Sequence, residues 1–230
     1  MKKLSRDAAY ANNFQTLKWA YENGFPISPE VCEKAALNGN LEILKWYRKK
    51  INPIEIWTSL FAIEGSHLEI LKWTLKKGIK MTHELCAMAA WHGHFDILKW
   101  LHENGCPWDS KTCVNAAYMG HFQILKWAYE RGCALSPKCC ADTACYGHVE
   151  ILKWLREKGC DWDDNLGSEA ILHNSVYIIE WFTNNGYKIN PIIYEELKRN
   201  KYMWKCLQEM YFFKENELVK SMSDYDKCFF

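Results

Sequence analysis

Apolar and polar positions follow one another along this chain in a pattern that returns every 27 residues. In the segments 93–100, 120–127 and 147–154, a Gly-His pair precedes two variable residues, two aliphatic residues, a lysine and a tryptophan. The same spacing separates the tryptophans at positions 19, 46, 73, 100, 127, 154 and 181. A fixed period of this length indicates a repeat architecture.

Each period predicts two short helices. In the copy 109–135, Asp109 is suited to cap a first helix over 111–119, and Gly120 to end it in the left-handed conformation. A second helix is expected over 122–131, ending before Gly132. Two helices and a tight turn leave no room for a strand. The position of Asp109 holds a capping residue in five other copies: Ser28, Thr82, Ser136, Asp163 and Asn190.

The repeats predict an all-α fold, an α-solenoid of helix–turn–helix units in which each unit buries its apolar face against its neighbours. We expect a single repeat domain over 1–216, followed by a C-terminal tail over 217–230. The first and last units act as caps, and the last has lost the consensus, with Gln208 in the tryptophan position. The predicted units are 1–27, 28–54, 55–81, 82–108, 109–135, 136–162, 163–189 and 190–216.

The segment AAWHGHFDILKWLHENGCPW at 89–108 resembles the ankyrin repeat, whose units read A-A-x-x-G-H-L-E-V-V-K-L-L-L-x-x-G-A. The resemblance covers 1–189 well and 190–216 weakly. The usual ankyrin unit has about 33 residues, with a β-hairpin finger and a T-P-L-H signature. Here DSKTC or SPKCC stands in that place, so the fingers are expected to be absent or much reduced. Short units rich in Trp and Cys are similar to ankyrin-like arrays of giant DNA viruses and some protists.

The composition of the chain limits the classes of function that we expect. The chain has 29 Lys and Arg against 28 Asp and Glu, so its bulk charge favours neither nucleic acid nor an anionic membrane. It has no apolar run long enough to cross a membrane and no signal-peptide core after the basic start. We therefore expect a cytoplasmic protein, or one in the host cell if it is viral, and a monomer. No catalytic triad, phosphate loop or zinc-protease motif is present, so we expect no enzyme and no cofactor.

Three residue types recur at fixed positions and have structural interpretations. The invariant tryptophan is expected in the core between units, rather than as a stacking platform for bases. The eleven cysteines are expected to be small buried apolar residues. No metal site is predicted, although Cys133, Cys139, Cys140 and Cys145 are dense enough to keep zinc as an alternative. The histidines of the Gly-His pair are expected to cap the second helix or to bond to the backbone of the adjacent unit.

A lysine precedes each of the first six tryptophans of the series and could form a ladder that follows a phosphate backbone. Acidic residues three positions before or four positions after these lysines indicate instead a neutralised, solvated helix face. A nucleic-acid-binding array is therefore the alternative function. The lysines are Lys18, Lys45, Lys72, Lys99, Lys126 and Lys153.

The variable positions at the end of each first helix are the candidate binding surface, because invariant positions hold a repeat array together. By position, the ankyrin resemblance places this pair of residues on the concave face. We therefore predict a non-catalytic protein–protein interaction scaffold that binds a host or regulatory factor there through aromatic anchors and polar neighbours. The predicted partner-binding residues are Met88, Trp91, His92, Asn115, Tyr118, Met119, Asp142 and Tyr146.

Overall fold

The computed structural model describes residues 2–51, 53–160, 176–184 and 191–212. It divides into two compact parts, Met1–Thr112 and Cys113–Phe230. The predicted caps Asp163 and Asn190 and the tail 217–230 lie outside the described residues. Throughout the described residues every regular element is a helix, as the pattern predicts, and no strand occurs where an ankyrin finger would stand.

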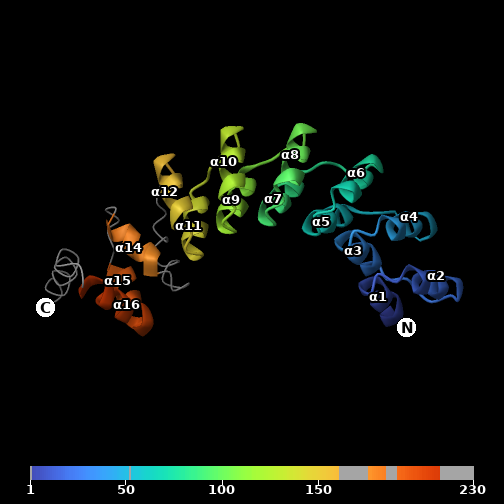
Figure 1. Cartoon of the computed structure of the whole chain (residues 1–230), viewed down its shortest axis with the longest axis horizontal. Coiled ribbons are helices and arrows are strands. Elements are labelled where there is room, and N and C mark those ends of the chain that lie inside the picture. Colours follow the sequence, from blue (N-terminus) through green and yellow to red (C-terminus); the bar gives the residue numbers. More distant parts are fainter. Residues whose placement is uncertain (1, 52, 161–175, 185–190, 213–230) are drawn as a thin grey trace. The chain divides into compact units, whose positions relative to one another are not determined.

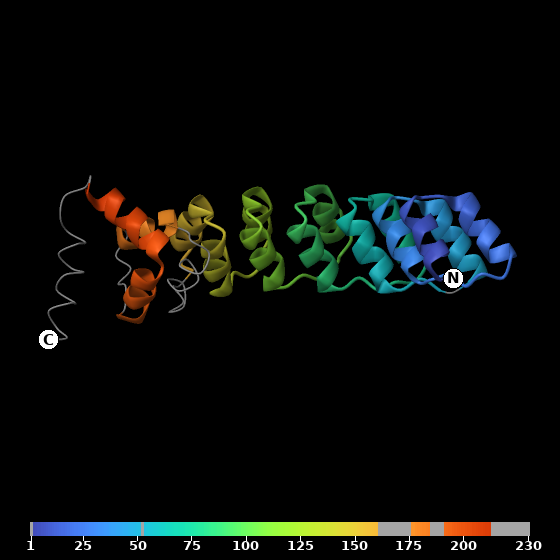
Figure 2. The ribbon, with the colours of Figure 1, turned by 90° about the horizontal axis from the view of Figure 1, so that it is seen from below.

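In Met1–Thr112, first and second helices alternate along the chain. The first helices α1, α3, α5 and α7 contact one another in succession, and each also packs on the second helix that follows it. Figure 1 shows the two kinds of helix in separate rows, and in Figure 2 the pair α7–α8 lies beside the pair α5–α6, while the pairs nearer the N-terminus overlap in that view. The helices are α1 Lys2–Tyr10, α2 Phe14–Glu22, α3 Glu30–Leu37, α4 Leu41–Lys50, α5 Ile56–Glu64, α6 Leu68–Lys76, α7 His83–Trp91 and α8 Phe95–Glu103.

In Cys113–Phe230 the alternation continues. α11 packs on α12, α12 contacts α14, and α16 packs on both α14 and α15. The last helix, α16, carries Met203, which is fully buried. The helices are α10 Phe122–Glu130, α11 Lys138–Cys145, α12 Val149–Glu157, α14 Val176–Asn184, α15 Pro191–Arg199 and α16 Lys201–Phe212; α9, Ser110–Tyr118, contains the boundary between the parts.

The core is built from the aliphatic pair that precedes each lysine, together with the small residues of the first helices. Leu44, Leu71 and Leu98 have no exposed surface, and neither do their counterparts Leu125 and Leu152. The alanine pairs of the first helices are buried as well, which lets neighbouring first helices approach closely. The buried column lies two positions before the tryptophan column.

The tryptophans lie between units, as expected, but they are only partly buried; Trp46 and Trp73 pack against the buried core as partly buried residues. Trp46, Trp73, Trp100, Trp127, Trp154 and Trp181 are half-buried, and Trp19 is 52% exposed. Trp46 packs edge-on against Phe14 and Tyr21 of the preceding second helix, at 5.7 and 5.6 Å between ring centroids. Trp154 does the same against Phe122 and Tyr129, at 5.9 and 5.3 Å. The invariant ring therefore seals the contact between second helices at the surface.

The histidine that directly precedes a second helix, after Ser66 at His67 and after a glycine at His94, links its turn to the preceding one. Nε2 of His67 lies 2.9 Å from the carbonyl oxygen of Leu37, and Nε2 of His94 lies 3.1 Å from that of Glu64. The imidazole of His67 lies against the turn glycine of the preceding repeat, where a Cβ on Gly39 would come within 2.6 Å of it. The prediction that these histidines bond to the backbone of the adjacent unit is confirmed for His67 and His94.

The first two repeats use asparagine in the histidine position. Asn13 and Asn40 cap their own helices by accepting hydrogen bonds from the backbone N–H groups three residues on, at 3.0 Å each. Asn40 also donates to the side-chain oxygen of Asn12 at 2.7 Å and so links its turn to the preceding one.

The first-helix caps follow the prediction only in part. Asp109 accepts a hydrogen bond from the N–H of Lys111 at 3.0 Å, and Ser28 accepts one from the N–H of Glu30 at 3.3 Å. Thr82 makes no side-chain capping bond, and its buried hydroxyl lacks a partner in the described part of the chain. Thr82 instead offers its carbonyl oxygen to the thiol of Cys106, 3.4 Å away. The capping role predicted for Thr82 is therefore wrong.

The cysteines stabilise individual repeats as small buried residues. Of the nine cysteines that the structure describes, none is in a disulfide and all but Cys206 are buried. The thiol of Cys113 donates to the carbonyl oxygen of Cys133 at 3.8 Å, and that of Cys140 to the carbonyl oxygen of Cys160 at 4.0 Å. Hydrogen bonding within each pair, and then burial, raise the pKa of Cys113 and Cys140 far above the usual thiol range. These groups stay protonated and are poor nucleophiles.

Candidate protein-binding surface

The structure brings two of the predicted residues together in Cys113–Phe230. Tyr118 ends α9 and Tyr146 follows α11, and their hydroxyl oxygens lie 2.7 Å apart. Their rings are tilted, with centroids 4.4 Å apart, and Tyr146 also stacks on His148 at 6.4 Å. Tyr146 is 50% exposed. These contacts restrain both phenol groups while half of the surface of Tyr146 stays exposed; we call Tyr118 and Tyr146 the tyrosine pair.

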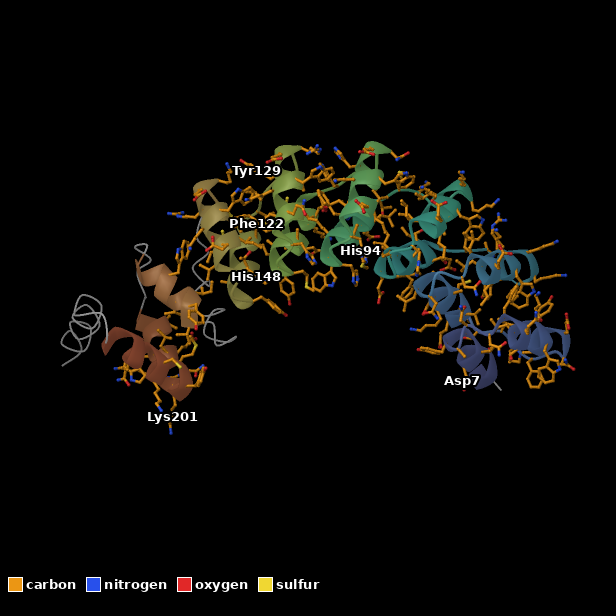
Figure 3. All side chains as sticks on the ribbon, in the orientation of Figure 1. Asp7, His94, Phe122, Tyr129, His148 and Lys201 are labelled. Carbon is orange, nitrogen blue, oxygen red and sulfur yellow. The ribbon has the colours of Figure 1, made fainter. Side chains whose placement is uncertain are left out.

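Polar and flexible side chains accompany the tyrosine pair on the same helices. Met119 follows Tyr118 and is 38% exposed, while Asn115, one turn earlier on α9, is half-buried. The side chain of Asp142 lies outside the described residues, although its backbone is part of α11. Figure 3 shows His148 at the turn before α12, and it places Phe122 and Tyr129 on α10, whose rings contact α12 through Trp154.

The other predicted residues belong to Met1–Thr112. Met88 and Trp91 are half-buried on α7, and His92 follows the helix and stacks on His94, with ring centroids 5.9 Å apart. They occupy the same positions of their repeat as Asn115, Tyr118 and Met119 do in the next one. The residues on α7 and those on α9 are therefore equivalent by their positions in the repeat.

The sequence analysis missed Tyr10 as a site residue. Tyr10 ends α1 in the position equivalent to Tyr118 and is 56% exposed, with the ammonium group of Lys34 4.6 Å from its ring centroid. The sequence could have indicated Tyr10, since it stands in the same variable column as Tyr118, in a repeat outside the regular central ones.

Each lysine of the column contacts a side chain of its own helix. Lys45, Lys72 and Lys153 form ion pairs of 2.7 to 2.8 Å with the glutamate three residues earlier. In the copies whose second helix begins with phenylalanine, the lysine lies over that ring instead, 3.9 to 4.2 Å from its centroid; these are Lys18, Lys99 and Lys126. Among the described residues, the acids four positions after the lysines form no ion pair with them, so carboxylates neutralise Lys45, Lys72 and Lys153, while Lys18, Lys99 and Lys126 keep their charge over a ring.

Neither a metal centre nor a membrane span stands out in the described part of the chain. No group of three or more His, Cys, Asp or Glu side chains there is arranged to hold a metal ion. None of the described helices combines the length and apolar character that crossing a membrane requires.

Comparisons with known proteins agree with this geometry. Residues 83–129 match the family model described as ankyrin repeats (many copies). The crystal structure of the human ASB11 ankyrin repeat domain superposes with a TM-score of 0.53 at 20% sequence identity, covering 71% of this chain and 86% of that one. No curated protein matches the chain. The fold is therefore an all-α repeat solenoid of the ankyrin type, as the sequence resemblance implies.

Proposed function

We propose that this ankyrin-repeat protein is a non-catalytic scaffold that binds a partner protein through the ends of its first helices. Ankyrin repeats are generally protein–protein interaction modules, and this supports the class of function. By the resemblance to ankyrin repeats, the ends of the first helices line the concave face. Its anchors are Tyr118 and Tyr146, with Met119 and Asn115 beside them, and Trp91 and His92 at the equivalent positions of the preceding repeat.

The observation that carries the proposal is the tyrosine pair. Interface hot spots are enriched in tyrosine and tryptophan, because a rigid ring buries a large area at a small cost in side-chain entropy. The 2.7 Å hydroxyl contact and the close rings restrain both side chains before any partner arrives. Tyr146 still exposes half of its surface, which is the area that a partner would cover.

The nucleic-acid alternative receives less support from the side chains. A phosphate-tracking ladder needs ammonium groups directed at the ligand, and its affinity falls steeply with salt. Here each ladder lysine lies on a glutamate or a phenylalanine of its own helix. Breaking those contacts would reduce the gain from each phosphate. We therefore place the site on the first helices.

Changing Trp91, Tyr118 and Tyr146 together to alanine is expected to abolish binding to the native partner. Truncation of anchors at an interface centre costs about 2 kcal/mol or more each. The partner would be captured from the native cell and identified by mass spectrometry, and its affinity measured by titration calorimetry with the wild-type and the triple-changed chain.

The matched control changes Lys72, Lys99 and Lys126 to alanine. This variant should bind within a few-fold of wild type, and both variants should keep the helical circular dichroism of the parent. If the lysine variant loses binding while the aromatic variant binds normally, the site lies on the second helices and the nucleic-acid class must be tested by salt titration.

A further inference from the structure

One second helix ends differently from the others. α4 runs to Lys50, and Ile51 follows it at the position where Gly24 and Gly78 adopt φ of +75° and +97°. Ile51 adopts φ −123° and ψ −74°, since a β-branched residue avoids the left-handed region. The connection that follows places Pro53 on the wall of a cavity, and Ile54, beside it, is buried.

This cavity lies at the amino-terminal ends of α3 and α5, wholly within Met1–Thr112. We call it the rim cavity; its walls include Glu33, Pro53, Ile54, Glu55, Trp57 and Thr58, and its volume is about 260 Å³. Pockets for small-molecule ligands usually hold about 300–1,000 Å³. The rim cavity is below that range and suits one long side chain.

Two carboxylates give the rim cavity a negative charge. Glu55 immediately precedes α5 without capping it through its side chain, and Glu33 lies in the first turn of α3. Within the described ranges, neither carboxylate forms an ion pair. The thiol of Cys32 on the same wall senses both charges: burial raises its pKa to about 12, with added contributions from Glu33 and Glu55. A cation entering the cavity would meet two carboxylates that have no other counter-ion there.

An indole and a hydroxyl complete the wall. Trp57 is 59% exposed, in a position that holds charged residues in most other repeats, such as Glu84 and Lys111. Thr58, on the same wall, is only 3% exposed.

We propose that the rim cavity binds an arginine side chain of a partner protein. A guanidinium group is planar, so it can stack on the Trp57 indole while its N–H groups reach the carboxylates of Glu33 and Glu55. Its apolar stem would cover Pro53 and Ile54. A lysine ammonium group, as a point charge, cannot combine stacking with bidentate pairing.

The helix dipole offers a competing account of the two glutamates, because acidic residues stabilise the first turn of any helix. That account explains neither the exposed indole nor the cavity beside the two carboxylates. The inference rests on the proposed function only in that the arginine comes from a partner protein. An arginine tripeptide tests the cavity directly, so failure here leaves the triple-alanine test untouched.

The experiment uses the full chain labelled with 5-fluorotryptophan, with the signal of Trp57 identified by its loss in Trp57→Phe. The probe is the blocked tripeptide Ala-Arg-Ala, and its matched controls carry lysine or uncharged citrulline in place of arginine. We expect a saturable shift of the Trp57 fluorine signal with the arginine peptide. Citrulline should bind at least about tenfold more weakly, since hydrogen bonds to charged groups contribute about 1.5–3 kcal/mol.

Glu55→Gln should weaken the arginine peptide about tenfold as well. Its control is Glu84→Gln, which removes an exposed carboxylate from the first turn of α7, away from the cavity walls, and should leave the affinity unchanged. The proposal is overturned by an arginine titration that does not saturate, by citrulline or lysine peptides that bind as tightly as arginine, or by equal effects of the two glutamate changes. Melting curves of both variants check that the fold is intact.

Discussion

Leu98→Ala is expected to lower the free energy of unfolding by about 2–5 kcal/mol, the largest effect of a single side chain in the array. Leu98 has no exposed surface and lies in the column that forms the core of every regular repeat. Removing its branched end leaves a cavity that the neighbouring helices can fill only by shifting toward it from their packed positions. Denaturant unfolding followed by circular dichroism measures the loss.

The next two residues provide the comparison. Lys99 lies over the ring of Phe95 at the surface, and Lys99→Ala should cost less than about 0.5 kcal/mol. Trp100 is half-buried, so Trp100→Ala should cost about 2 kcal/mol, through lost packing but without a closed cavity. A larger loss for Trp100→Ala than for Leu98→Ala would contradict the placement of the core in the aliphatic column.

Gly65→Ala is expected to destabilise the chain by about 2–4 kcal/mol, for a reason that its backbone angles do not reveal. Gly65 has φ −78°, which alanine adopts without strain. Its Cβ, however, would overlap the carbonyl oxygen of Leu37 and come within 2.7 Å of Cδ2 of His67. The added methyl group would push His67 off the Leu37 carbonyl and separate two adjacent turns.

Gly105→Ala is the matched control, because Gly105 has a positive φ and open space around it, whereas Gly65 has a negative φ and close neighbours. Gly105 has φ +77°, and a Cβ there would meet nothing within 4 Å. Only the strain of left-handed alanine remains, about 1–2 kcal/mol. In the double variant Gly65→Ala/His67→Ala the loss should be smaller than the sum of the two single losses, since both act on one contact. Equal costs for the two glycines, with additive behaviour of Gly65 and His67, would contradict the turn-to-turn contact.

Local signals in the sequence were enough to predict the helices and turns. α9 and α10 begin and end within one residue of the predicted ranges, because Gly120 and Gly132 supply the positive φ that ends a helix. The role of the Gly-His pair also followed from its position, since a histidine directly after a turn can reach the preceding turn.

The tryptophan column is less buried than a core position. On a helix, a residue two positions after a fully buried leucine points well away from it, whereas one three positions after a buried isoleucine lies near it, so the tryptophan stands at the edge of the buried face. The ring makes edge-on contacts with the preceding helix, such as those of Trp154 with Phe122 and Tyr129. The rim cavity was beyond prediction, because its walls come from residues of several elements that only the folded chain brings together.

The division of 1–216 into eight units and a separate tail stays a prediction, as do the viral resemblance and the monomeric state. The candidate surface was predictable only as a set of variable positions. The contact of the Tyr118 and Tyr146 hydroxyls joins two different positions of the repeat, because Tyr118 ends its helix while Tyr146 lies one residue further along. The aligned positions placed both residues on one strip of adjacent repeats, but they did not predict the contact between the two hydroxyls.

Hydroxyl-radical footprinting of the chain with and without its captured partner tests the central claim most directly. Tyr146 and Met119 are exposed and readily oxidised, and Trp19 and Tyr177 are exposed on second helices, α2 and α14. The account predicts that the partner sharply reduces oxidation of Tyr146 and Met119 and leaves Trp19 and Tyr177 unchanged. Unchanged oxidation of Tyr146 and Met119, with protection confined to the second helices that carry the lysines, would contradict it.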